Sequence, residues 1–184
     1  MPDPRPLVIA VGGIPGSGKT TLSRRLGDVL HLPVVCRDAI KEGMHVTHGS
    51  DDPAEVRRFS AAAFTTFWAT VGALVDAGSS VVAEAAFHRE FAADEFTELS
   101  ARADLILVWC DLDPEIATNR YLARAERGER HPAHADSTLV PAMRAPGFDW
   151  STYAPPDGPW PVHSVDTTAA PKLDALLECL SAAR

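Results

Sequence analysis

The sequence reads Gly13-Ile14-Pro15-Gly16-Ser17-Gly18-Lys19-Thr20 directly after an apolar run, and this stretch decides the fold. It matches the pattern G-x-x-x-x-G-K-[ST] at every fixed position. Glycines in such a loop allow successive backbone N–H groups to turn inward around a phosphate group. A helix is expected to begin at Thr20, and its N-terminus would add a positive dipole end to the same attraction.

The loop predicts a nucleoside triphosphate and a divalent cation as cofactors. Lys19 is expected to span the β- and γ-phosphates, and the hydroxyl of Thr20 is expected to bind Mg²⁺. The sequence has no N-K-x-D motif, so ATP is expected rather than GTP. The predicted nucleotide-binding residues are Gly13, Ile14, Pro15, Gly16, Ser17, Gly18, Lys19, Thr20 and Thr21.

Short apolar runs and amphipathic helical patterns alternate on both sides of the loop. The runs predict strands at 7–11, 33–36, 80–84, 105–110 and 162–165. The helical patterns cover 20–30, 39–47, 53–78, 88–102, 113–127 and 171–182. Such alternation predicts an α/β fold with three layers, in which a five-stranded parallel sheet lies between helices. No repeat or linker divides the chain, so one domain is expected over residues 1–184.

Composition is that of an ordinary soluble domain. Of the 184 residues, 46% are hydrophobic and 23% are charged. The apolar run before the loop is too short for a signal sequence or a membrane span, so we expect a cytoplasmic protein without a membrane partner. The 17 basic and 25 acidic residues give a net charge of −8, which disfavours nucleic acid as a partner. Cys36, Cys110 and Cys179 are expected to be buried free thiols.

Four stretches resemble a known group of small P-loop kinases, related to chloramphenicol phosphotransferase, zeta toxins and the kinase domain of polynucleotide kinases. They are Gly12-Gly-Ile-Pro-Gly-Ser-Gly-Lys-Thr-Thr21, Cys36-Arg-Asp-Ala-Ile-Lys-Glu42, Ser80-Val-Val-Ala-Glu-Ala-Ala-Phe87 and the arginine-bearing helix after Asp113-Pro114. The resemblance implies an adenylate-kinase-like strand order, a helical lid at approximately 120–137 and transfer of a phosphoryl group to a hydroxyl.

The resemblance also assigns residues to the acceptor side. Asp38 follows the second strand, where these kinases place the aspartate that contacts the acceptor hydroxyl, and it would act as base or orienter. Its alternative role is an N-cap of the helix at 39–47. Arg37 and His88 would contact the substrate, although His88 could instead only cap a helix. Glu84 could hold a Mg²⁺-bound water or a substrate hydroxyl, and its alternative is a strand-end acid that faces solvent.

Arginines on the predicted lid helix form the last group. Arg120, Arg124 and Arg127 share one helix face, and Arg130 follows in the loop. In the resembled kinases, lid arginines clamp the transferring phosphoryl group, so Arg120 and Arg124 are expected to be catalytic and Arg120 also to bind the nucleotide. The alternative is a solvated face that pairs with neighbouring glutamates.

The acceptor itself is the least predictable feature. Its pocket is expected between the phosphate loop, the segment 39–50 and the helix 53–78. Candidate lining residues are His45, His48, Arg57, Arg58, Phe64, Phe67 and Trp68, although the aromatic ones fit core packing equally well. Three functions stay open: a kinase for a sugar, nucleoside or antibiotic-like small molecule, a polynucleotide 5′-hydroxyl kinase, and an ATP-binding or ATP-hydrolysing regulator without an acceptor.

Overall fold

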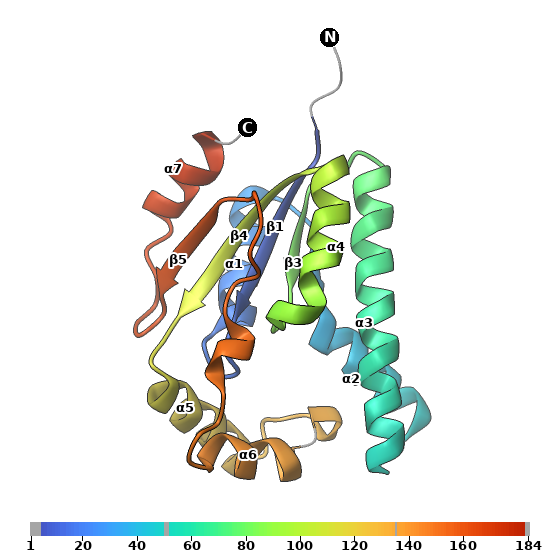
Figure 1. The fold of residues 1–184 in the computed structure, drawn as a ribbon, viewed down its shortest axis with the longest axis vertical. Coiled ribbons are helices and arrows are strands. Elements are labelled where there is room, and N and C mark those ends of the chain that lie inside the picture. Colours follow the sequence, from blue (N-terminus) through green and yellow to red (C-terminus); the bar gives the residue numbers. More distant parts are fainter. Residues whose placement is uncertain (1–4, 50–51, 135, 183–184) are drawn as a thin grey trace.

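The computed structural model describes residues 5–49, 52–134 and 136–182 of the chain. Within them, five strands form one parallel sheet in the order β2-β3-β1-β4-β5. The strands are β1 (Leu7–Gly13), β2 (Val34–Cys36), β3 (Val81–Glu84), β4 (Asp104–Asp111) and β5 (Val162–Asp166). This arrangement confirms the predicted α/β fold and the adenylate-kinase-like strand order (Figure 1).

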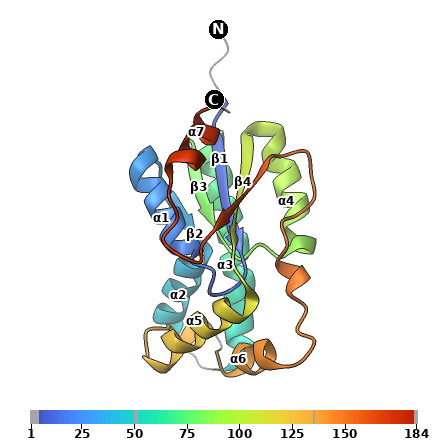
Figure 2. The same cartoon turned by 90° about the vertical axis from the view of Figure 1, so that its left-hand side faces the viewer.

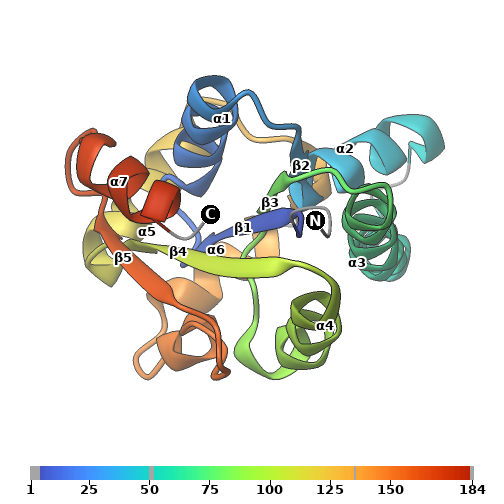
Figure 3. The same cartoon turned by 90° about the horizontal axis from the view of Figure 1, so that it is seen from above.

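Helices cover both faces of the sheet, so β1 and the middle of β4 are buried from both sides (Figure 3). The helices are α1 (Lys19–Leu30), α2 (Arg37–His48), α3 (Pro53–Asp76), α4 (Arg89–Arg102), α5 (Pro114–Glu126), α6 (Asp136–Arg144) and α7 (Asp174–Ala182). Val8 and Ala10 of β1 pack toward α3 and α4, and Ile9 and Val11 pack toward α1 and α7. Two-sided burial explains why β1 is continuously apolar rather than alternating.

Helix α3 is the one helix of the described residues whose length and composition would allow it to cross a membrane. Its apolar stripe nevertheless has a place in this fold. Phe67, Val71 and Val75 are almost fully buried in the core between α3, α4 and the sheet. The expected helix at 53–78 is therefore present, and its apolar side chains contribute to core packing.

Two details differ from the expectations. Helix α2 begins at Arg37, and its N-cap position is Cys36, so Asp38 lies in the first turn and does not cap the helix. The three cysteines are free, as expected, but only Cys110 is buried. Cys36 is half-buried, and Cys179 is exposed on α7. The amphipathic pattern of α7 turns Leu176 and Leu180 inward and leaves Cys179 outside.

Segments that are far apart in sequence meet at the carboxyl ends of the strands. The phosphate loop follows β1, α2 follows β2, and Glu84 is the last residue of β3. Helices α5 and α6 lie across this end of the molecule (Figure 2). The proline-rich segment between α5 and β5 holds α6 and two short 3₁₀ helices, Pro132–His134 and Trp150–Tyr153. Parallel α/β sheets bind their ligands at the carboxyl ends of their strands.

Candidate active site

The phosphate loop has the backbone shape that its glycines predict. Gly13, Gly16 and Gly18 all have positive φ angles, of 133°, 87° and 89°. At Gly16 a second constraint applies, since a Cβ atom there would lie 2.2 Å from the carbonyl oxygen of Ala117 on α5. Only glycine allows the loop to approach α5 this closely. The loop is therefore a preformed cradle for a phosphate group.

Lys19 lies across this loop and is almost buried. Its Nζ donates a hydrogen bond to the carbonyl oxygen of Ile14 at 3.0 Å, and the side chain is 8% exposed. The bond holds the ammonium group over the loop, where a phosphate would gain the most from a fixed positive charge.

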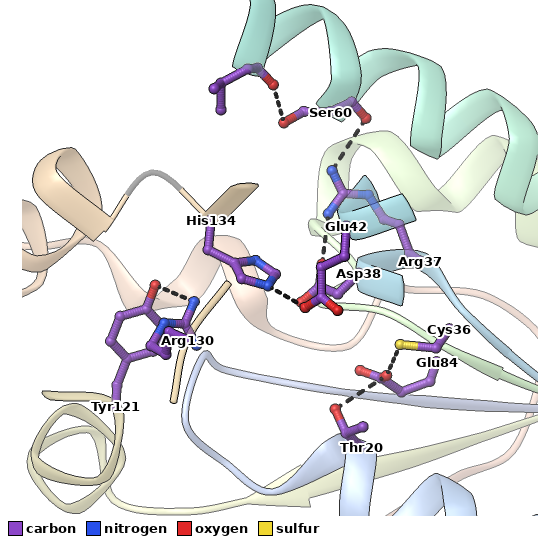
Figure 4. A network of polar contacts seen from close by, with 11 residues as sticks. Thr20, Cys36, Arg37, Asp38, Glu42, Ser60, Glu84, Tyr121, Arg130 and His134 are labelled. Atoms are coloured by element: carbon purple, nitrogen blue, oxygen red, sulfur yellow. Dashed lines mark hydrogen bonds and ion pairs between the residues drawn. The ribbon is translucent and has the colours of Figure 1, made fainter. Parts of the chain in front are cut away.

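A threonine, a carboxylate and a thiol meet beside the loop (Figure 4). Thr20 Oγ1 donates to Glu84 Oε2 at 3.3 Å, and Cys36 Sγ donates to the same oxygen at 2.7 Å. Glu84 is 1% exposed, which corrects the alternative that it faces solvent. Desolvation raises the pKa of Glu84, and the charge of Lys19 opposes the shift without cancelling it. A hydroxyl and a carboxylate are oxygen ligands that suit Mg²⁺, so these residues fit the cation that the loop implies.

Cys36 is held in its protonated form. Burial, followed by the nearby charge of Glu84, raises the pKa of the thiol to about 12. The thiol therefore donates a hydrogen bond to the carboxylate. The sequence predicted only a buried free thiol at Cys36. The contact with Glu84 arises from the pairing of β2 with β3, so sequence reasoning missed it.

Two of the acceptor-side residues predicted from sequence, Arg37 and Asp38, lie on the first turn of α2. Arg37 Nη1 lies 3.4 Å from Asp38 Oδ1, and Arg37 Nη2 donates to the carbonyl oxygen of Ser60 on α3 at 3.3 Å. The carboxylate of Asp38 is about half exposed, with a side-chain value of 48%. It is therefore open to a ligand while the neighbouring guanidinium is tied to α3.

One cavity of about 310 Å³ joins these groups to the phosphate loop. Its walls include Gly16, Gly18, Lys19, Thr20, Thr21, Arg37, Asp38, Glu84, His88, Arg124 and Arg130. Desolvation and the charge of Arg37 lower the pKa of His88, which favours a neutral imidazole near pH 7. His88 occupies the N-cap position of α4 without making a side-chain cap bond, and its ring centroid lies 4.6 Å from that of Tyr153. The structure thus brings most of the predicted site residues together.

The lid contributes two arginines to this cavity. Arg130 Nη2 donates to the hydroxyl of Tyr121 at 2.7 Å, which directs the loop after α5 back toward the helix. Burial, followed by the positive charge of Arg130, lowers the pKa of Arg124. A bound polyphosphate would offset this repulsion between like charges. His134 Nε2 lies 2.6 Å from Glu42 Oε1 and connects the lid to α2. Residue 135 of the predicted lid lies outside the described residues.

Arg120 and Arg127 lie apart from Asp38. Arg120 donates to the carbonyl oxygens of Thr167 and Thr168 at 2.9 and 2.6 Å, in a separate depression beside Gly18 and Thr21. The loop after β5 captures the side chain, which helical spacing alone could not reveal. This position favours the nucleotide-binding part of its predicted role over the phosphoryl clamp. Arg127 pairs with Glu129 at 2.5 Å on the surface, as the solvated-face alternative expects.

Three more residues line the same cavity. Tyr121 and Tyr153 are buried, and Lys41 is 8% exposed. Lys41 lies one turn after Arg37 on α2, in one of the stretches that resemble the small P-loop kinases. Tyr153 follows no periodic pattern, and its 3₁₀ helix brings it to the site. Of the three, Tyr121 is the one that sequence reasoning missed.

The fold and the loop with its lysine, threonine and carboxylate define a nucleotide-binding protein of the P-loop class. A family model described as an AAA domain, AAA_33, matches residues 8–146, and the chain belongs to this family. No curated protein sequence matches the chain.

Solved structures extend the similarity to the whole chain. A candidate kinase from Chloroflexus aurantiacus J-10-fl is 28% identical with a TM-score of 0.85, and the match covers 98% of this chain and 99% of that one. A gluconokinase from Sinorhizobium meliloti 1021 shares 17% identity and a TM-score of 0.55, over 98% of this chain and 90% of that one. A sugar kinase from Janibacter sp. HTCC2649 shares 17% identity and a TM-score of 0.58, over 97% and 94%. The fold is thus that of P-loop kinases.

Proposed function

We propose that this chain is an ATP-dependent kinase that transfers the γ-phosphoryl group to a hydroxyl of a small molecule. One observation carries the proposal: Asp38 lies on the wall of the same cavity as the phosphate loop and Arg124. Phosphoryl transfer to an alcohol requires a carboxylate, a phosphate-binding loop and positively charged side chains around one cavity.

The nucleotide side of the site would work through contacts already formed. The N–H groups of the loop and the ammonium of Lys19 would bind the β- and γ-phosphates. Thr20 and Glu84 would hold Mg²⁺, and the ion would supply positive charge to the phosphate oxygens during transfer. Arg120 of α5 would contact the nucleotide beside the loop after β5, whose carbonyl oxygens already hold its guanidinium group.

On the acceptor side, Asp38 would orient the hydroxyl and take its proton. The acceptor oxygen forms a bond to the γ-phosphorus, the bond from that phosphorus to the bridging oxygen breaks, and ADP leaves. Arg124 and Arg130 would balance the negative charge on the transferring oxygens. Closure of the lid would exclude water, which competes with the acceptor.

The other two functions explain less of the site. An ATP-dependent regulator needs neither an acceptor base nor a lid with arginines that repel each other when the site holds no anion. A polynucleotide kinase would need to attract a phosphate backbone, which a net charge of −8 opposes. The gluconokinase and the sugar kinase have the same fold, which is compatible with a small-molecule acceptor.

The test is ADP release from ATP·Mg²⁺ with and without a panel of sugars, nucleosides, hydroxylated antibiotics and 5′-hydroxyl oligonucleotides. ³¹P NMR of the stimulated reactions would show whether a phosphate ester forms. We expect one class of small molecule to stimulate ADP release and to yield an ester. Steady release that is indifferent to every compound would favour the regulator, and stimulation by oligonucleotides alone would favour the polynucleotide kinase.

A further inference from the structure

A second cavity of about 510 Å³ lies beside the active site, between α3 and the segment that follows β3. Its volume is within the range of small-molecule sites, about 300–1,000 Å³. Aromatic side chains form most of its wall, including Phe64 and Trp68 from α3, and Phe87 and Phe91 from the other side. Phe91 is 67% exposed at the start of α4, so core packing does not explain its place on this wall.

The two cavities are adjacent and share part of their walls. Arg37, Ala86 and His88 line both of them. Arg37 reaches from Asp38 to the carbonyl oxygen of Ser60, and Ser60 also lines the second cavity (Figure 4). A molecule that occupies the second cavity and extends past Arg37 would reach the carboxylate of Asp38.

Trp68 contributes its aromatic ring to this wall, and its N–H does not face the cavity. The side chain is 7% exposed and lines the cavity, but its indole nitrogen is fully buried and has no hydrogen-bond partner among the described residues. A ligand in the cavity would therefore meet the ring of Trp68 and not its N–H group.

We propose that the phosphate acceptor is amphipathic, with an aromatic body in this second cavity and its reacting hydroxyl at Asp38. This inference rests on the proposed kinase function and specifies its substrate class. A polyol such as gluconate would place several hydroxyl groups against aromatic side chains that cannot bond them, and each unpaired hydroxyl costs free energy.

The first test compares acceptors of the two classes. Three (methoxyphenyl)ethanols, with the methoxy group at ring position 2, 3 or 4, are compared with gluconate and glucose for stimulation of ADP release. We expect the best aromatic alcohol to exceed both polyols by at least about 10-fold in kcat/KM, as one or two extra apolar contacts would give.

One pair of variants locates the binding site. Ala61 lines the second cavity and is exposed on α3, whereas its neighbour Ala62 is exposed outside the cavity wall. Ala61→Trp should fill the cavity and lower kcat/KM for the aromatic alcohol by at least about 10-fold, with ATP affinity unchanged, and Ala62→Trp should change neither value.

The outcomes separate this inference from the function on which it rests. If the polyols react as well as the aromatic alcohols and Ala61→Trp has no effect, the inference is wrong and the kinase function stands. If no compound of either class, nor of the wider panel, stimulates ADP release, the proposed function itself fails.

Discussion

At the residue scale, the site depends on a carboxyl group that the fold desolvates. Glu84 ends a buried strand and accepts hydrogen bonds from Thr20 and Cys36, and desolvation is the main cause of its raised pKa. Its pKa is higher in the folded than in the unfolded protein. Its contribution to stability is therefore present below the unfolded pKa and is lost as the pH rises through the folded pKa. The ionised carboxylate therefore lowers the stability of the folded, nucleotide-free protein, and its charge would be available to a bound cation.

This balance predicts the behaviour of Glu84→Gln. The amide keeps an acceptor oxygen for both hydrogen bonds but carries no charge, so the nucleotide-free variant should melt at the same temperature as the wild type or a few degrees higher at pH 7–8. The advantage should disappear at low pH, where Glu84 is protonated. Transfer activity should fall by at least about 100-fold, because a ligand of the predicted cation is lost. Thermal denaturation at several pH values and a kinase assay measure the two effects.

Glu98→Gln serves as the control, since Glu98 is exposed on α4 and far from the loop in sequence. A Glu84→Gln protein that melts well below the wild type at every pH, or that keeps its activity, would contradict this role of the carboxyl group.

The phosphate loop could be predicted from local sequence, because its chemistry depends on fixed spacings along a strand, a turn and a helix. Asp38 was assigned instead from the resemblance to small P-loop kinases, and its role stays a prediction. The Cys36–Glu84 contact could not be predicted, because it depends on the register between β2 and β3, which places Cys36 opposite Glu84. Trp68 shows the same limit. Its helical spacing is that of a core residue, and only the three-dimensional packing shows that its N–H is left without a partner.

At the element scale, α5 divides its arginines between two tasks. Arg124 faces the cavity that holds Asp38, whereas Arg120, one turn earlier, bonds the loop after β5. Helical spacing correctly predicted that the two residues share a face of α5. It could not show that a loop from the far end of the chain lies over the first half of that face.

The division predicts two different kinetic effects. Arg124→Ala should lower kcat by about 100- to 1,000-fold with little change in ATP affinity, as expected for a charge that acts during transfer. Arg120→Ala should raise the KM for ATP by about 10-fold and leave kcat within about 3-fold. Arg102→Ala is the control, because Arg102 is exposed at the end of α4, pairs with Asp76 and lines none of the cavities described above. Steady-state kinetics with varied ATP distinguish the effects, and the reverse assignment would show that Arg120 is the clamp.

At the scale of the whole molecule, the sheet and its two helical layers follow from strong local patterns. Each strand is a short apolar run, each long helix has a periodic apolar stripe, and the loop after β1 defines the class of fold. The region from 128 to 161 was less predictable, because its prolines and isolated aromatic residues form no period. That region supplies α6 and Tyr153, which close one side of the cavity. The parts that determine the acceptor are thus the parts with the weakest sequence signal.

The most direct test of the account compares Asp38→Asn with the wild type, using the best acceptor from the panel. Asparagine has the same shape but cannot take a proton, so transfer to the acceptor should fall by about 100- to 10,000-fold. ATP affinity, measured by calorimetry with a non-hydrolysable analogue and Mg²⁺, should stay within about 2-fold, because Asp38 lies on the acceptor side. That result is the one the account predicts. Acceptor phosphorylation at the wild-type rate by Asp38→Asn would contradict the assignment of this cavity as a kinase active site built around Asp38.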